Sequence, residues 1–490
     1  MRLRLLVVSL LSVSFLGALD HTVVSTSLAT IAGDLGALEQ MSWVVVGYTL
    51  SSTVLLPVIG KLGDAIGPRS VFLTSLVAFL AASVLCGFAP DMGWLVVARV
   101  IQGATSAGLQ LMSQTILAHV TSPRERPRYM AVIGAAFPIA ILIGPVVGGL
   151  ITDYWGWPWV FWINVPIGLA ALALAVVVVP HIDPAPARRF DVAGSVTFTI
   201  SLVALVLAVS WVGDPSAARA AMVCFLTAVV SFAAFLLVEL RSPQPVVPLR
   251  LFRNRTIAAG LALSAIIGIG LFSVTAYLPT YFQMAYRTSV TVSGLVPIAT
   301  VFGMLVSNLV TGWMASRSGR YRVFAISGTM LAAVGLFVMA LLPVGLPLWV
   351  PMVVMFFVGV GTGAFMSLII AVVQSAVPKT QLGAVTASVN LVRQVGATVT
   401  TAVIGGVVAT GVAGLLPGGL DIATLTPQLV HAADVATQAE VAAIYTSVFA
   451  PVFIGLAIAY AVGVVAAVLL PAGRLSEEQP VAVDAQPLPA

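Results

Sequence analysis

The sequence predicts an all-α polytopic membrane protein, and composition and apolar patterning carry that prediction. Of the 490 residues, 60% are hydrophobic and only 8% are charged, and the mean hydropathy is +1.10. This composition excludes a soluble domain with a single core. Fourteen apolar runs reach or approach the roughly 20 residues that a helix needs to span a bilayer. Helices are the expected spans, because no run shows the alternation of a barrel strand.

The runs divide the chain into three parts and a tail. We expect an N-terminal six-helix bundle (1–180), two inserted helices with proline-rich connectors (181–250), a C-terminal six-helix bundle (251–475) and a disordered cytoplasmic tail (476–490). Residues 427–440 are expected to form a short amphipathic helix on the outer face. The runs are 5–31, 41–59, 71–88, 93–119, 130–151, 160–179, 192–212, 220–238, 256–284, 292–313, 323–342, 348–373, 381–410 and 444–470.

The basic residues predict the orientation. If the N-terminus is cytoplasmic, eighteen of the 22 basic residues fall in cytoplasmic loops and tails. Arg219 and Arg287 fall outside, whereas Arg99 and Arg393 lie within runs. The positive-inside rule therefore places both termini in the cytoplasm. The net charge of +5 reflects this topology rather than nucleic-acid binding. Because arginine dominates over lysine, as in GC-rich bacteria, we expect a multi-pass protein of a bacterial cytoplasmic (inner) membrane.

Asp20 is the one acidic residue inside any of the runs. A charge at the bilayer centre costs about 2.5 to 3.5 kcal/mol on insertion scales, so an intramembrane acid is by default a hypothesis about ion or proton handling. Removal from water favours the neutral form of a carboxyl group, which would let Asp20 exchange protons near neutral pH. We therefore expect Asp20 to bind and release protons.

A short pattern recurs 252 residues along the chain. Gly60 and Gly67 bracket a basic segment after the second run, and Gly312 and Gly319 bracket another after the tenth. If the seventh and eighth runs are an insertion, the tenth is the second helix of a second six-helix half, where a parallel repeat would place the recurrence. A chance similarity between two glycine-rich turns is the alternative.

Several segments resemble motifs of one known family. The segment beginning at Gly60 is similar to the signature between helices two and three of the major facilitator superfamily, and the whole chain resembles its fourteen-helix drug/proton antiporter branch. The resemblance implies a major facilitator fold of two six-helix bundles plus two inserted helices. The other segments are 19–24, 99–103, 144–149, 159–166 and 390–396, and the departures from the family pattern are Ser25, Ser27, Ala29, Ala65, Ala131 and Ala140.

Four residues of the Gly60 segment form a candidate conformational latch, namely Gly60, Asp64, Gly67 and Arg69. The two glycines permit tight turns, and Lys61 and Arg69 supply counter-charge to Asp64. The resemblance implies that Asp64 meets the positive N-terminal end of the thirteenth helix and so favours an outward-open state. A solvated acid in a turn is the alternative.

The fifth helix carries a small-residue face. Gly144, Gly148 and Gly149 lie on nearly one face beside Pro145, and such a face lets helices approach closely while proline permits a kink. Ordinary tight packing explains the pattern as well as a functional role does. The resemblance implies an antiporter motif, which is associated with exporters and favours antiport over uptake.

Arg99 and Arg393 lie deep within the fourth and thirteenth runs and need internal partners. We expect both to face the first helix. The resemblance implies that Arg99 takes part in proton transfer with Asp20. For Arg393, a structural role on backbone carbonyls and a role in substrate binding remain equally open.

Polar groups in otherwise apolar spans are candidates for a substrate cavity, although many would simply bond neighbouring helices. An apolar cavity with sparse donors suits hydrophobic or amphipathic molecules. The candidates are Gln110, Gln114, Tyr277, Tyr281, Asn308, Asn390, Arg393 and Gln394.

The sequence therefore predicts proton-coupled efflux of hydrophobic or amphipathic compounds, of the multidrug type, by alternating access. An exporter of an endogenous lipid, cell-wall precursor or metabolite is the alternative, and a non-transporting membrane sensor is a minor one. An enzyme is not expected, because the runs hold no paired carboxylates and no metal-ligand spacing. We expect no cofactor, since the proton gradient drives transport. The expected partners are protons, a small substrate and membrane lipid, without nucleic acid, and the expected state is a monomer.

Overall fold

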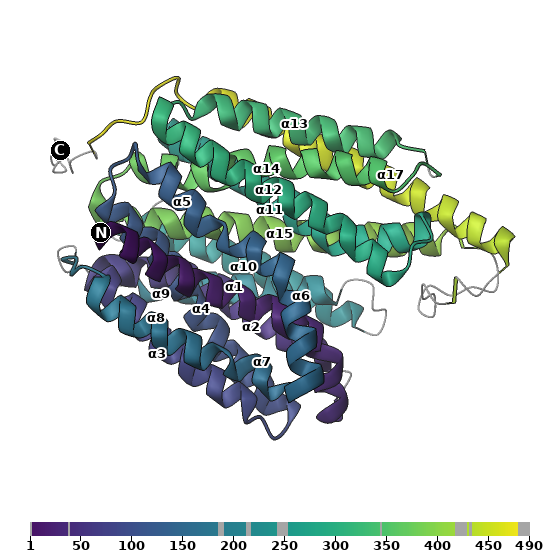
Figure 1. Ribbon diagram of the computed structural model, residues 1–490, viewed down its shortest axis with the longest axis horizontal. Coiled ribbons are helices and arrows are strands. Elements are labelled where there is room, and N and C mark those ends of the chain that lie inside the picture. The colour runs from purple at the N-terminus through teal and green to yellow at the C-terminus, as the bar shows by residue number, and fades with distance from the viewer. Residues whose placement is uncertain are drawn as a thin grey trace.

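The computed structural model describes residues 2–37, 40–184, 191–211, 217–242, 253–343, 345–416, 429–430 and 434–478. Helices make up most of this part of the chain (Figure 1). Thirteen helices or helix pairs are long and apolar enough to cross a membrane, and α11 (Arg255–Ala285) supplies a fourteenth span whose first part, Arg255–Gly270, is apolar. The predicted all-α architecture of fourteen spans is confirmed.

The N-terminal bundle makes six spans from eight helices, because two spans are broken. α5 and α6 form one span and α7 and α8 another. The breaks follow from Pro138 and Pro166, whose rings carry no N–H for the carbonyls of Gly134 and Trp162, the last residues of α5 and α7. The helices are α1 (Arg2–Asp34), α2 (Met41–Ile66), α3 (Pro68–Gly87), α4 (Met92–Val120), α5 (Arg126–Gly134), α6 (Ala136–Trp155), α7 (Pro158–Trp162) and α8 (Asn164–Val178).

The inserted pair and the C-terminal bundle follow. Side chains cap several of these helices: Asp191 accepts a hydrogen bond from the Gly194 amide at 2.8 Å, and Ser289 accepts one from the Val292 amide at 3.3 Å. The inserted helices are α9 (Val192–Ser210) and α10 (Ala218–Arg241). The C-terminal bundle contains α11, α12 (Val290–Ser318), α13 (Arg322–Leu341), α14 (Trp349–Ser375), η3 (Lys379–Gln381), α15 (Leu382–Ala413) and α17 (Val435–Leu469).

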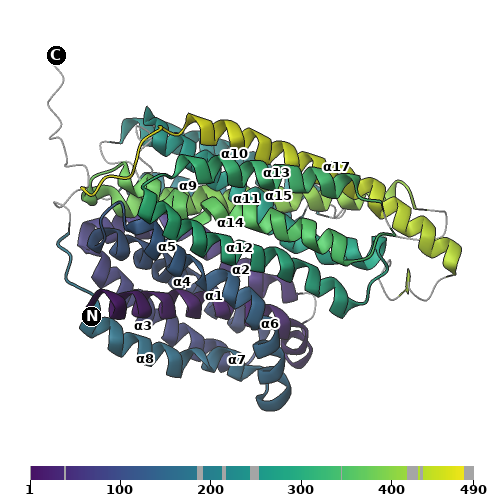
Figure 2. The same cartoon turned by 45° about the horizontal axis from the view of Figure 1, so that its top comes forward.

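The two bundles meet at one end of the molecule and spread apart toward the other. Figures 1 and 2 show the start of α1 and the end of α17 on the side where the bundles meet. We call this side the basic end and the opposite side the far end. The seam between the bundles is formed by α2 and α4 against α15 and by α5 against α12 and α14. α9 contacts both α2 and α15, so the inserted pair lies against this seam.

Several helices extend beyond their apolar runs. α2 continues through Gly60 to Ile66 and α12 continues through Gly312 to Ser318, so these glycines lie inside helices rather than in the predicted turns. Within 427–440, Leu429 and Val430 are helical and the residues from Val435 onward belong to the first turns of α17. Residues 427–428 and 431–433 of the expected surface helix lie outside the described residues. The expected disordered tail lies outside the described residues from position 479 onward.

Candidate functional site

A buried polar network surrounds Asp20 in the N-terminal bundle. Its Oδ2 lies 2.6 Å from Nη1 of Arg99, and its Oδ1 accepts hydrogen bonds from Nε2 of Gln102 at 2.9 Å and from Nδ2 of Asn164 at 2.7 Å. The same Gln102 nitrogen donates to Oγ of Ser83 at 2.8 Å. All five side chains are at most 1% exposed. Helices α1, α3, α4 and α8 therefore converge on one carboxylate.

Arg99 is held from several directions. Its Nη1 donates to Oε1 of Gln102 at 2.7 Å, and its guanidinium carbon lies 4.1 Å from the ring centroid of Tyr48 and 5.8 Å from that of Phe161. Aromatic faces stabilise a guanidinium cation at such distances. The Asp20–Arg99 pair is neutral as a unit, yet losing one partner of a buried pair typically costs about 3 to 5 kcal/mol. Any change in the charge of Asp20 must therefore reorganise the network.

Tyr48 lies between this pair and His21. Its hydroxyl donates to Oγ of Ser106 at 2.6 Å, and its ring centroid lies 5.7 Å from that of His21. His21 is half-buried, and no hydrogen bond joins it to Asp20 in the described part of the chain. The structure therefore gives His21 no direct place in the network.

Sequence reasoning identified two members of this network and missed the others. Gln102 follows Arg99 by three residues, a spacing that places both on one face of α4, so the signal was present. Asn164 lies inside segment 159–166, which resembles a motif of the family, so the sequence indicated this residue as well. Ser83 and Tyr48 had none, because a serine or a tyrosine in an apolar helix is common and its direction depends on how the helix is rotated.

Asp20 is not the only acid inside a described span, because the helices are longer than their apolar runs. Glu239, in the last turn of α10, is 3% exposed.

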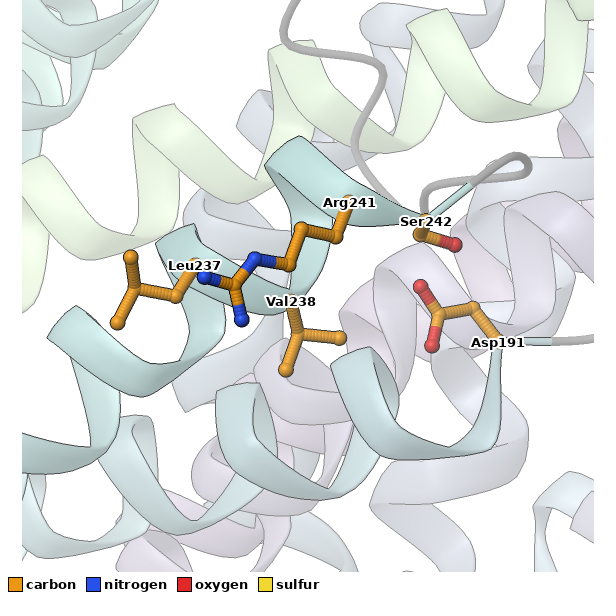
Figure 3. A pocket seen from close by; sticks show the side chains of 5 residues that line it. All are labelled: Asp191, Leu237, Val238, Arg241 and Ser242. Carbon is orange, nitrogen blue, oxygen red and sulfur yellow. The ribbon is translucent and has the colours of Figure 1, made fainter.

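A small pocket at the basic end, near Glu239, is lined by Asp191, Leu237, Val238, Arg241 and Ser242. Figure 3 shows the Asp191 carboxylate turned toward Ser242. This pocket belongs to the inserted pair and not to the Asp20 network.

Asp64 joins the two bundles at the basic end. Its Oδ1 accepts a hydrogen bond from the Gly383 amide and its Oδ2 one from the Ala384 amide, both at 2.9 Å. These amides belong to the first turn of α15, where free N–H groups and the helix dipole favour a negative charge. The contact implied by the family resemblance is therefore present.

Of the other latch residues, Gly60 and Arg69 act differently from the expectation and Gly67 acts as expected. Gly60 permits close packing rather than a turn, because a Cβ there would lie 2.7 Å from the carbonyl oxygen of Gly383. Gly67 does form the turn, with a φ of 92°. Arg69 donates to the carbonyl of Val176 at 2.8 Å, on α8, so it stabilises a helix end instead of supplying counter-charge to Asp64.

The small face of the fifth span packs on α1 through two of its three glycines. A Cβ at Gly144 would collide with Thr22, and one at Gly148 would lie 2.9 Å from the carbonyl oxygen of Val23. A Cβ at Gly149 would meet nothing within 4 Å, so its predicted place on the packed face is wrong. Pro145 lies inside α6, whereas the break in this span falls earlier, at Ala135.

Two predicted cavity residues, Gln114 and Asn390, form a polar bridge across the seam, and Arg393 lies beside it. Nδ2 of Asn390 on α15 donates to Oε1 of Gln114 on α4 at 2.8 Å, and Nη2 of Arg393 donates to Oδ1 of Asn390. On the basic-end side, Nε2 of Gln374 donates to Oγ1 of Thr386 at 2.8 Å and reaches the Gln114 carbonyl at 3.5 Å. Arg393 thus bonds within α15, and no hydrogen bond joins it to the first helix in the described part of the chain.

The remaining candidates separate into two groups. Gln110 is exposed and Gln394 half-buried, so both are accessible. Asn308 instead donates to the carbonyl of Ala131 at 2.9 Å and closes the seam between α12 and α5. Tyr281 is 2% exposed and stacks within the C-terminal bundle, 4.9 Å from the Phe449 ring, so its assignment to the central cavity is wrong.

Tyr277 lies near Tyr281. Its hydroxyl donates to the carbonyl of Thr401 at 2.8 Å, and its ring lines a small apolar pocket between α11, α15 and α17 together with Phe449 and Phe453. Packing inside one bundle explains both tyrosines.

Most of the chain is similar to known proteins of one family. The family model described as the Major Facilitator Superfamily matches residues 10–401. An uncharacterized MFS-type transporter of Mycobacterium tuberculosis is 32% identical over 92% of this chain and 67% of its own length. The multidrug transporter protein MdtP of Bacillus subtilis is 31% identical over 82% of this chain and 75% of its own length. The efflux pump FUS6 of Gibberella fujikuroi is 30% identical over 81% of this chain and 73% of its own length.

Solved structures of distant proteins share the fold. The human organic anion transporter MFSD10 superposes with a TM-score of 0.64 at 16% identity, covering 96% of this chain and 99% of that one. The proton:xylose symporter XylE superposes with a TM-score of 0.62 at 15% identity, covering 96% of this chain and 97% of that one. At these identities the likeness concerns the fold alone.

Proposed function

Because the chain belongs to the major facilitator superfamily, we propose that it exports hydrophobic or amphipathic compounds in exchange for protons. The observation that carries this proposal is the buried Asp20–Arg99 pair. Burying a carboxylate, even one that accepts from three donors, costs more free energy than a purely structural role justifies. A reversible proton site requires such a group. Some relatives are named as multidrug transporters or efflux pumps, which favours export over uptake.

The coupling step follows from the geometry of α4. Protonation of Asp20 removes the charge that faces Arg99 and leaves the guanidinium without its counter-ion. Arg99 and Gln102 lie on α4, and so does Gln114, which bonds across the seam to Asn390. A shift of α4 after protonation therefore strains the bridge between the bundles. This links the proton site to the opening of the basic end.

The cycle follows once the membrane orientation is set. The positive-inside rule supports a cytoplasmic basic end, and on that orientation we take the arrangement of the bundles as the outward-open state of the proposed cycle. Asp20 takes a proton from outside in this state, and the bundles then rock about the seam. The proton leaves inward, and substrate bound from the inside is carried out on the return.

The test is dye uptake into inverted membrane vesicles under an imposed pH gradient. We expect Asp20→Asn to reduce proton-driven uptake of lipophilic dyes at least about tenfold, because the neutral amide cannot exchange a proton. Asp153→Asn is the matched control, since Asp153 is exposed near the far end of α6. Asp20→Glu keeps a carboxylate and is expected to retain part of the activity. Unchanged proton-driven uptake by Asp20→Asn would sink the proposal.

A further inference from the structure

Arg393 is a positive charge in the middle of α15 without a carboxylate partner. Its Nη2 donates a hydrogen bond to Oδ1 of Asn390, a neutral amide. None of the ion pairs among the described residues includes Arg393. Because Asp20 and Arg99 neutralise each other, the middle of the described spans keeps one uncompensated positive charge. An uncompensated guanidinium in a low-dielectric region attracts an anion.

The guanidinium lies just beyond the polar bridge, on the side of the far end. α15 runs from the basic end toward the far end, and Arg393 follows the bridging Asn390 by three residues, about 4.5 Å of helix rise. α4 runs in the opposite direction, and Gln110 precedes the bridging Gln114 by four residues, about 6 Å of rise. The two side chains therefore come to one level above the floor that the bridge forms.

Both side chains at this level keep accessible surface. Gln110 is exposed. Its spacing places it on the same face of α4 as Arg99 and Ser106, and that face points into the N-terminal bundle rather than toward lipid. Arg393 keeps 7% of its surface accessible. The two bundles spread apart toward the far end (Figure 2). An anion entering from that side reaches the guanidinium before it meets the closed bridge.

We propose that Arg393, together with Gln110, forms a subsite for the anionic head group of an amphipathic compound, such as a carboxylate. One nitrogen of the guanidinium is used on Asn390, and its other N–H groups match a planar anion. The Gln110 amide adds a donor, and the apolar spans accommodate the remainder of the compound. This inference rests on the proposed export function and narrows its substrates to singly charged anions.

Equilibrium binding tests the subsite without a proton gradient. The full-length protein in nanodiscs of zwitterionic lipid is titrated with 11-(dansylamino)undecanoic acid and with its methyl ester. We expect the acid to bind at least about tenfold more tightly than the ester, because a charge-assisted bond contributes more than a neutral one. Arg393→Gln is expected to bring the two affinities together, whereas Arg393→Lys retains part of the preference. Arg255→Gln, which removes an exposed charge at the start of α11, is the matched control.

Three further arms separate the outcomes. Retained ester binding by Arg393→Gln shows that the variant is folded, so that a lost preference for the acid then supports the subsite. Competition by potassium chloride but not by potassium gluconate would identify a small inorganic anion as an occupant of the same subsite. Equal affinities of acid and ester in the unmodified protein, or a preference that survives Arg393→Gln, would overturn the inference. This binding assay uses no proton gradient, so a lost preference for the acid and a loss of proton-driven uptake are separate results, and failure of proton coupling alone is distinguishable.

Discussion

Gly60 of α2 and Gly312 of α12 make the same contact on opposite sides of the seam. A Cβ at Gly60 would lie 2.7 Å from the carbonyl oxygen of Gly383, and a Cβ at Gly312 would lie 2.8 Å from that of Pro127. In both cases a helix from one bundle packs directly on the backbone of the other. The recurrence seen in the sequence therefore corresponds to a repeated packing contact.

The two sides differ one turn further along. Asp64 follows Gly60 by four residues and accepts two amide hydrogen bonds, whereas Ser316 stands at that offset from Gly312. The receiving helix differs as well: Gly383 donates an amide to Asp64, but Pro127 has no N–H to donate. Glycine thus provides close approach on both sides, while a directional charged bond exists on one. We infer that closure of the basic end depends mainly on α2 and α15.

Removal of the Asp64 charge should have the largest effect on closure of the basic end. Asp64→Asn leaves one of the two amides without an acceptor, and each hydrogen bond to a charged group contributes about 1.5 to 3 kcal/mol. We expect the free energy of closing the basic end to weaken by about 2 to 3 kcal/mol. Electron paramagnetic resonance between spin labels at Ser70 and Arg255, exposed residues of the two bundles, measures the open fraction.

Ser316→Ala is the matched control for that measurement, because Ser316 has the same offset from its glycine and no acid to lose. We expect its distance distribution to equal that of the parent. If Asp64→Asn and Ser316→Ala shifted the distribution equally, the asymmetry between the two sides would be wrong.

The two seam glycines, Gly60 and Gly312, should contribute equally to closure of the basic end, although only the Gly60 side carries an acid. Gly60→Ala and Gly312→Ala each place a methyl group against backbone, and overpacking of this kind costs about 1 to 3 kcal/mol. We expect the same spin-label pair to report similar opening in both variants. Gly149→Ala provides the reference, since its methyl group meets nothing within 4 Å. A large effect of only one of the two seam glycines would show that the contacts are not equivalent.

The sequence predicted features that depend on one helix at a time and failed where two helices must be oriented together. Fourteen spans, the buried Asp20 and the need of Arg99 for a partner followed from apolar length and the cost of charge. The assignments of Tyr281 and Gly149 were wrong because each depends on how a helix is rotated. In a chain that is 60% hydrophobic, most faces of a helix are equally apolar, so the sequence leaves that rotation open.

The contact of Asp64 with α15 required the family resemblance. Nothing in the residues around Asp64 indicates which of the other helices begins beside it, more than three hundred residues along the chain. The interruption of α5 and α6, by contrast, was open to prediction from Pro138, whose missing N–H breaks the helical hydrogen-bond ladder. Local backbone chemistry was readable from the sequence, and long-range pairing was not.

The smallest expected effect is a gain in the stability of the closed basic end. Ser316→Asp places a carboxylate near the first turn of α5, where Pro127 offers no amide and one donor fewer exists than at α15. Arg124, whose Nη2 donates to the carbonyl of Arg317 at 3.2 Å, adds a nearby positive charge. We expect closure to strengthen by about 0.3 to 1 kcal/mol, the usual range for an acid at a helix N-terminus. The spin-label distances should sharpen toward the closed value, and the variant should partly restore closure when combined with Asp64→Asn. A gain as large as the loss from Asp64→Asn would mean that the missing amide at Pro127 is immaterial and that the acid alone distinguishes the two sides.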